Sequence, residues 1–293
     1  MKALNLKHIV LLLIPLTVQA QEPDSTSALY GMLVAERNFA RESVANGRNA
    51  AFLKNMAEGS VIFTDSWITS GLKYFEERES SPYVLKWEPE YMDLAASADF
   101  GISTGPWEMQ EYRPNTTPVS TGYFLTVWRK DNSGQWKAIL DAGISTPPVS
   151  GTPHLISFPP AAGNIKGEFT GDMSSGTAME ISEAEKMALG KWVMDPTADT
   201  YLTFLTGGIR MLNNGHLPAT DKDLINKWIT QGGRSLVWIT AGSGAARSGD
   251  IGYTYGYFQD AADPGKNTGH YVRIWKKQPD NSWLIDLEMR SFD

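Results

Sequence analysis

The chain has 293 residues, of which 42% are hydrophobic and 20% are charged, so one or two packed domains are expected and wholesale disorder is not. Lys and Arg number 26 against 33 Asp and Glu, without a basic cluster, which argues against nucleic acid as a partner because phosphate binding needs concentrated positive charge. Cysteine is absent, which excludes disulfides and cysteine-linked lipids.

The N-terminus has the three regions of a secretory signal peptide. Lys2 and Lys7 supply positive charge, the stretch 9–16 is apolar, and Val18-Gln19-Ala20 resembles a signal-peptidase cleavage site. We therefore predict a signal peptide over residues 1–20, cleavage after Ala20, and a periplasmic or secreted mature protein. The apolar stretch is too short to cross a bilayer and no longer one follows it, so no membrane span is expected.

The first elements after this segment read as helices. Apolar residues recur at near-helical spacing from Leu29 to Val44, and Asn46-Gly47 is typical of a helix end. A second short helix is predicted over 50–56 and a third over 72–79. The apolar burst Val61-Ile62-Phe63 between them predicts a strand.

A run of strands follows the helices. Their predicted ranges are 83–88, 92–96, 99–109, 121–130 and 135–143. Asp131-Asn132-Ser133-Gly134 has the composition of a turn between the last two. Helices followed by an antiparallel meander indicate an α+β fold in which the helices lie on one face of a sheet.

The stretch from Asp99 to Trp107, DFGISTGPW, contains two apparent catalytic motifs. Asp-Phe-Gly is the magnesium-binding tripeptide of protein kinases, and Gly-x-Ser-x-Gly is the nucleophile elbow of α/β-hydrolases. The sequence has no His-Arg-Asp loop, and Pro106-Trp107 ends the stretch where an elbow would need a helix. We interpret the stretch as a structural strand whose glycines relieve its curvature.

The chain contains a second copy of this pattern. An offset of 151 residues aligns Leu85-Lys86-Trp87 with Leu236-Val237-Trp238, and it turns Ser103 into Thr254. Offsets of 149 and 147 residues align the blocks before and after, pairing Ala35-Glu36 with Ala184-Glu185, Phe52 with Tyr201, Trp128 with Trp275, and Asp141 with Glu288. Two homologous domains are predicted, over 28–146 and 178–293, joined by a Pro/Gly/Ser-rich linker over 147–177.

These segments together resemble the nuclear transport factor 2-like superfamily. The likeness is carried by the segments 46–53 and 57–63, by Ser97-Ala98-Asp99-Phe100-Gly101-x-x-x-Gly105, by Val127-Trp128-Arg129-Lys130 and by Gly134-x-Trp136-Lys137-x-x-x-Asp141. They are similar to a secreted bacterial branch near ketosteroid-isomerase-like and polyketide-cyclase-like proteins. The resemblance implies two cone-shaped domains, each a bent antiparallel sheet wrapped around N-terminal helices with a pocket at its open end. It also implies an intrachain pseudo-dimer packed sheet to sheet, and leaves a further homo-oligomer open.

The same resemblance implies where an acid-base catalyst would lie. Steroid isomerases of this superfamily use an Asp base on the strand after the second helix, and that position falls on Thr64, one residue before Asp65. Their helix-1 Tyr falls on Ala40, so the set is incomplete. Asp141, which Glu288 matches, follows an apolar stretch where a raised pKa would suit a base, although a solvated or interface-facing position is the alternative. Asp65 and Asp141 are the candidate catalytic residues.

Aromatic residues and histidines are suited to line such a pocket. The predicted ligand-binding residues are Trp67, Tyr74, Tyr123, His216 and His270. The histidines at 154, 216 and 270 are not within metal-ligand spacing of one another, so no metal and no other cofactor is predicted.

The preferred hypothesis is an exported tandem protein that binds a small, mostly apolar ligand in a pocket of one or both domains. One alternative is a cofactor-independent isomerase, cyclase or dehydratase with a carboxylate base in the first domain. Another is a protein-assembly module, which would have a large exposed apolar sheet face and no cavity.

Overall fold

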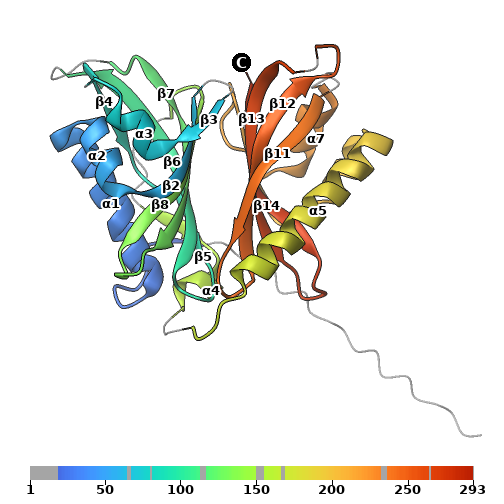
Figure 1. Ribbon diagram of the computed structural model, residues 1–293, viewed down its shortest axis with the longest axis horizontal. Coiled ribbons are helices and arrows are strands. Elements are labelled where there is room, and N and C mark those ends of the chain that lie inside the picture. The colour runs from blue at the N-terminus through green and yellow to red at the C-terminus, as the bar shows by residue number, and fades with distance from the viewer. Residues whose placement is uncertain are drawn as a thin grey trace, which may run out of the picture.

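The computed structural model describes residues 19–64, 67–79, 81–112, 117–149, 155–165, 169–231, 236–263 and 265–292. Two groups of helices and strands follow one another along the chain, each with its own sheet (Figure 1). The α+β fold with two tandem domains, expected from the sequence, is confirmed. No described helix has the length and hydropathy needed to span a membrane.

In the first half, helices precede a long bent sheet. Its helices are α1 (Ala28–Asn46), α2 (Arg48–Asn55), α3 (Gly71–Glu76) and the short α4 (Pro160–Gly163). Its strands are β1 (Gln19–Gln21), β2 (Met56–Thr64), β3 (Trp67–Ser70), β4 (Tyr83–Trp87), β5 (Tyr91–Leu94), β6 (Phe100–Glu111), β7 (Ser120–Lys130), β8 (Trp136–Ser145) and β9 (Ile156–Phe158). The strand order is β1-β9-β5-β6-β7-β8-β2-β3, and β4 also pairs with β6. The meander from β5 to β8 is antiparallel as predicted, whereas β2 joins β8 in parallel.

The second half repeats the central part of this arrangement. Its elements are α5 (Ser174–Met194), α6 (Ala198–Leu202), β10 (Leu205–Asn213), α7 (Lys222–Gln231), β11 (Leu236–Ala245), β12 (Ile251–Asp260), β13 (Asn267–Lys277) and β14 (Trp283–Phe292). The strand order is β10-β14-β13-β12-β11, with β10 parallel to β14. Thr126 lies opposite Asp141 across β7 and β8, and Arg273 lies opposite Glu288 across β13 and β14. The residue pairs that the sequence repeat aligns therefore occupy equivalent positions in the two sheets.

Helix α1 begins and ends where its sequence predicts. The Ser27 side chain accepts a hydrogen bond from the backbone N–H of Tyr30 at 3.2 Å, which caps the first turn. Gly47 ends the helix with a φ of 85°, a conformation that glycine adopts without steric cost. The apolar side of α1, from Leu29 to Phe39, is buried against the concave face of the first sheet.

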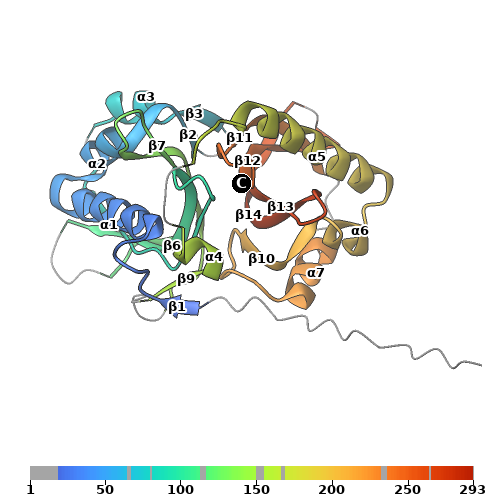
Figure 2. The same ribbon diagram turned by 90° about the horizontal axis from the view of Figure 1, so that it is seen from below.

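The opposite faces of the two sheets pack against each other. A single apolar cluster joins Leu125, Val127 and Leu140 of the first half to Val272 and Leu287 of the second. Helices α1 and α2 consequently lie on one outer side of the molecule and α5 on the other (Figures 1 and 2). This is the sheet-to-sheet pseudo-dimer that the resemblance implies.

The segment predicted as a linker contains two short elements of the first half. Strand β9 pairs with β1 and, at Ser157, with Tyr91 of β5, and α4 follows it directly (Figure 2). Ile156 and Phe158 belong to the same core cluster as α1. Part of this proline-rich segment therefore completes the first domain before the chain crosses to α5.

The glycines of DFGISTGPW are required by close contacts between strands. A Cβ atom on Gly105 would lie 2.1 Å from the carbonyl oxygen of Glu88, in the bend between β4 and β5. In the second copy, a Cβ atom on Gly256 would lie 2.0 Å from the carbonyl oxygen of Ile239. Real Cβ atoms do not come this close, so both copies need glycine where β6 and β12 meet a bent neighbouring strand.

Candidate functional site

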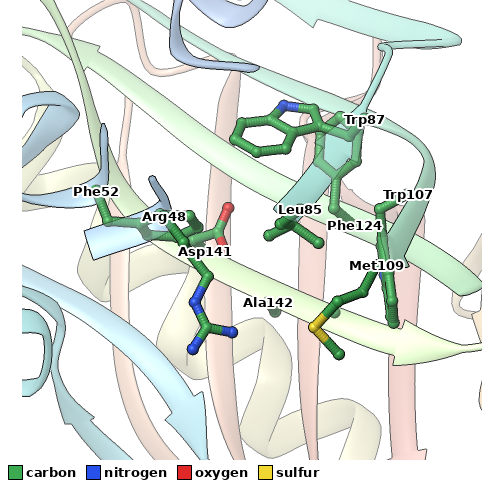
Figure 3. Close-up of a pocket in the computed structure, with 10 residues that line it drawn as sticks. Arg48, Phe52, Leu85, Trp87, Trp107, Met109, Phe124, Asp141 and Ala142 are labelled. Carbon is green, nitrogen blue, oxygen red and sulfur yellow. The ribbon is translucent and has the colours of Figure 1, made fainter. Parts of the chain in front are cut away.

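The concave face of the first sheet encloses a pocket of about 190 Å³ (Figure 3). Ten residues line it: Arg48, Phe52, Leu85, Trp87, Trp107, Met109, Phe124, Asp141, Ala142 and Gly143. Eight of these ten are apolar residues or glycine, and the two charged ones are Arg48 and Asp141. The lining therefore suits a mostly apolar molecule with a small number of polar contacts.

Strand pairing places the main side chains of this pocket. Trp87 on β4 lies opposite Trp107 on β6, and Phe124 on β7 lies opposite Gly143 on β8. Residues that lie opposite each other in a sheet point to the same face, so each pair contributes to one wall. Because position 143 carries no side chain, the space in front of Phe124 stays open.

A bulge in β8 turns Asp141 toward the pocket. Ala138 belongs to the core beneath α1, whereas Leu140 belongs to the core between the two sheets. Strict alternation would put Ala138 and Leu140 on one face, but the register shifts at this point by one residue. Asp141 therefore lies on the concave side, and the expected alternative of an interface-facing position is not observed.

The environment of Asp141 favours its protonated form. The carboxyl group is half-buried, and Thr126 Oγ1 donates a hydrogen bond to Oδ2 at 2.7 Å. Burial raises the pKa of Asp141 to about 7; the Thr126 hydrogen bond opposes this shift, and the nearby Glu36 carboxyl adds to it. No cation pairs with Asp141 among the residues that the structure describes. A group with a pKa near neutrality can both give and take a proton.

Glu36 on α1 is fully buried behind the pocket wall, where it accepts three hydrogen bonds. Its Oε1 accepts a hydrogen bond from Trp87 Nε1 at 2.6 Å, and its Oε2 accepts from Trp128 Nε1 at 2.9 Å and from the Ser103 hydroxyl. Trp128 Nε1 also donates to Ser103 Oγ at 2.9 Å. Burial raises the pKa of Glu36, although these three donors oppose it. Ser103 is thus a buried hydrogen-bonding residue of the core and not an exposed nucleophile.

The equivalent cone of the second half is filled by two arginines. Arg273 stands where the first half has Thr126, and Arg290 stands where it has Gly143. Both are buried, with 1% and 8% of their surface exposed. Arg273 lies 4.0 Å from the ring centre of Trp238, the equivalent of Trp87.

These arginines neutralise the carboxylates of the second half. Arg273 contacts Glu185 Oε1 at 2.6 Å and Glu288 Oε2 at 3.1 Å, and Arg290 also pairs with Glu288. Burial alone would raise the pKa of Glu288, but Arg290 and Arg273 hold it below its usual value. Glu288 is therefore an ionised structural group, whereas its equivalent Asp141 has a raised pKa and faces an open pocket.

Arg48 is the second charged residue of the first-half pocket. It begins α2, and its Nε is buried without a hydrogen-bond partner among the described residues. Burial lowers the pKa of Arg48, and the groups that act on its charge are Tyr74 and Arg78. Its guanidinium is thus influenced by α3 and its continuation, and it forms no ion pair with Asp141.

Of the predicted site residues that the structure describes, Asp141 alone lines this pocket. Asp65 lies outside the described residues. Trp67 on β3 is 66% exposed, and Tyr74 on α3 packs against Phe75 and under Arg78. Tyr123, His216 and His270 also lie outside this pocket.

Tyr123 and His270 belong to the region between the two sheets. Tyr123 is buried there and donates a hydrogen bond to Glu90 Oε2 at 2.9 Å. His270 stacks on Phe63 of the first half with ring centres 4.4 Å apart. His216 follows β10 and lies against Trp228 of α7. Within the described residues, no group of three potential ligands is arranged to hold a metal ion.

Sequence reasoning missed Arg48, Trp107 and the Glu36 network. Glu36 carried a usable signal, because Ala35-Glu36 recurs as Ala184-Glu185 and a charged residue inside an apolar helix face needs a buried partner. Arg48 carried none, since Thr197 occupies the equivalent position in the second copy.

Comparison with known proteins finds likeness only among solved structures. No protein-family model matches the chain, and no curated protein sequence is similar to it. An NTF-2 like protein of unknown function from Shewanella oneidensis MR-1 shares 15% identity and a TM-score of 0.32, covering 39% of this chain and 97% of that one. One from Pseudomonas putida KT2440 shares 16% identity and a TM-score of 0.34, covering 40% of this chain and 87% of that one.

A nuclear transport factor 2-like superfamily protein from Salmonella enterica shares 12% identity with a TM-score of 0.34, covering 45% of this chain and 99% of that one. These are the kinds of protein that the sequence resemblance names, and each match spans about the length of one half. The fold of this chain rests on its own element order and strand pairing, described above.

Proposed function

We propose that the first half of this protein binds a small, mostly apolar molecule and that the second half is a closed copy of the same unit. The observation that carries this proposal is the exchange of Thr126 and Gly143 for two buried arginines, Arg273 and Arg290. A cavity of about 150 Å³ lined by apolar residues can hold benzene. The first-half pocket, at about 190 Å³, suits one ring with a few substituents.

Filling the pocket tests this proposal. A Cβ atom on Gly143 would lie 3.5 Å from Trp107 Nε1 and 3.8 Å from the carbonyl oxygen of Tyr123, so a side chain can be added there without a clash. Binding of indole, followed by ligand-observed NMR, should be lost in Gly143→Arg and kept in the matched control Gly143→Ala. Equal binding by both variants would place the site elsewhere and reject the proposal.

A second candidate function, acid-base catalysis, is favoured by the pKa of about 7 at Asp141. A half-buried carboxylate titrating near neutrality can remove a proton from a bound carbon acid. The probe 5-nitrobenzisoxazole fits this test, because a base that takes its ring C–H proton breaks the N–O bond and yields a coloured cyanophenolate. Ring opening above the solvent rate, rising with pH around 7 and lost in Asp141→Asn, would support catalysis; an unchanged rate in the variant would exclude Asp141.

The assembly-module hypothesis has less support. It required an exposed apolar sheet face and no cavity, whereas the helix-free faces of the two sheets cover each other and the first half has a pocket.

Export remains part of the proposal, with cleavage after Ala20. Gln19 and Ala20 pair with Phe158 and Ser157 in the short strand β1, so cleavage would leave only Gln21 of that strand. N-terminal mass spectrometry of protein from the periplasm or medium should find Gln21 first. Recovery of the intact N-terminus from the cytoplasm alone would reject export.

A further inference from the structure

The cone of the second half holds a cation that belongs to the chain itself, the side chain of Arg290. Arg290 projects its guanidinium into the cone, pairs with Glu288, and lies 4.8 Å from the ring centre of Tyr201 and 5.0 Å from that of Trp238. The cation is therefore held by one carboxylate and two aromatic faces. This combination is a common way to bind an organic cation.

The first half keeps this frame without the cation. Asp141 stands at the position of Glu288, Trp87 at that of Trp238, and Phe52 at that of Tyr201, and all three line the pocket. Gly143 replaces the arginine itself. The volume that a guanidinium and its alkyl chain occupy in the second half is thus open in the first (Figure 3).

The carboxyl groups of Asp141 and Glu36, in the first-half pocket and behind its wall, have no cationic partner among the described residues. Both of their equivalents, by contrast, contact Arg273. Arg48 also lines the pocket, but the charged and titratable groups that act on it are Tyr74 and Arg78, not Asp141. The deep part of the pocket therefore presents a carboxyl group and aromatic faces to the ligand.

We propose that the first-half pocket selects a small organic cation, an amine, amidine or guanidine on an apolar body of about one ring, with the cation on Asp141 and against Trp87. This inference rests on the proposed function, because it names the class of ligand for the same pocket. A charge-assisted hydrogen bond together with a desolvated cation–π contact is expected to give at least about tenfold tighter binding than a neutral molecule of the same shape.

Three probes of nearly identical shape test this selectivity. Benzamidine is cationic, benzamide is neutral and benzoate is anionic, and each places its polar group on the same ring. Their dissociation constants are measured by calorimetry at pH 8.5, above the pKa of about 7 of Asp141, for the unmodified protein and for Asp141→Asn. We expect benzamidine to bind at least about tenfold tighter than benzamide to the unmodified protein. In Asp141→Asn the two dissociation constants should become about equal.

Failure of the cation selectivity and failure of the binding function give different results with these probes. Equal binding of benzamide and benzamidine, both lost in Gly143→Arg, would overturn the cation selectivity and leave the binding function intact. Tightest binding of benzoate, lost in Arg48→Gln, would overturn it in favour of an anion bound by Arg48. Binding of no probe would count against both proposals. Circular dichroism of each variant confirms that a lost signal is not a lost fold.

Discussion

Replacing Asp141 by Asn is expected to stabilise the protein at high pH. The folded protein raises the pKa of Asp141 from 3.8 to about 7, so the folded state holds the proton more tightly than the unfolded chain does. The contribution of protonated Asp141 to the free energy of unfolding is therefore fully present below about pH 4 and is lost as the pH rises toward 7. A shift of this size corresponds to at most about 4 kcal/mol, at about 1.4 kcal/mol for each pH unit.

Asparagine keeps an oxygen that can accept the Thr126 hydrogen bond but carries no charge. The free energy of unfolding in urea, followed by circular dichroism, should be nearly equal for both proteins at pH 4. At pH 9 the variant should be more stable by up to about 4 kcal/mol. The control is Glu288→Gln, which removes an ionised partner of two buried arginines and should destabilise the protein at both pH values.

The same pH dependence in the unmodified protein and in Asp141→Asn would refute this reasoning, because another group would then cause it. Glu36 is the other buried acid that acts on Asp141, and its Gln variant identifies its share. A variant that is less stable than the unmodified protein at pH 9 would mean that Asp141 is ionised and paired in the folded state.

Three further variants test the packing, each by urea unfolding. Ser103→Ala removes a buried donor to Glu36 and should lower the free energy of unfolding by about 1–3 kcal/mol. Ser103→Thr introduces the residue of the second copy and should lower it less. The reverse order would argue against the hydrogen-bond network around Glu36. Gly105→Ala brings a Cβ atom to within 2.1 Å of a carbonyl oxygen and should lower the free energy of unfolding by about 1–3 kcal/mol or more. Its control, Gly176→Ala in open space on α5, should raise the free energy of unfolding by up to about 1 kcal/mol. Asp93→Asn breaks a buried ion pair with Lys276 between the two halves. It should cost less than the roughly 3–5 kcal/mol of a fully lost pair, because Asp286 Oδ2 remains 3.5 Å from Lys276 Nζ. No loss of stability would mean that this ion pair does not hold the halves together.

Much of the fold could be predicted because two copies report on one structure. Agreement between the copies separated structural residues such as Trp128 and Trp275 from chance motifs, and it showed that DFGISTGPW is a strand. The parallel pairing of β2 with β8 was not predicted, because strands far apart in sequence give no local signal of their direction. The short elements β9 and α4 were hidden in a proline-rich segment, because β9 is held by its pairing with β1 and β5 and α4 by its packing against α1.

The site was harder to predict than the fold for a physical reason. The direction of Asp141 depends on a one-residue bulge in β8, and alternation alone would place it on the other face. Trp67 is exposed on an outer strand and Tyr123 is buried between the two sheets, so aromatic residue type alone does not locate a pocket. The sequence does contain one signal that was not used, the difference between the copies at Gly143 and Arg290, which indicates one open and one filled cone.

A crystal structure of the protein soaked with benzamidine tests the central claim most directly. We predict density for one molecule in the first-half pocket, with its amidinium on Asp141 and against Trp87, and none in the arginine-filled cone of the second half. Density in the second half instead, or an empty first-half pocket at a benzamidine concentration far above the measured dissociation constant, would contradict it.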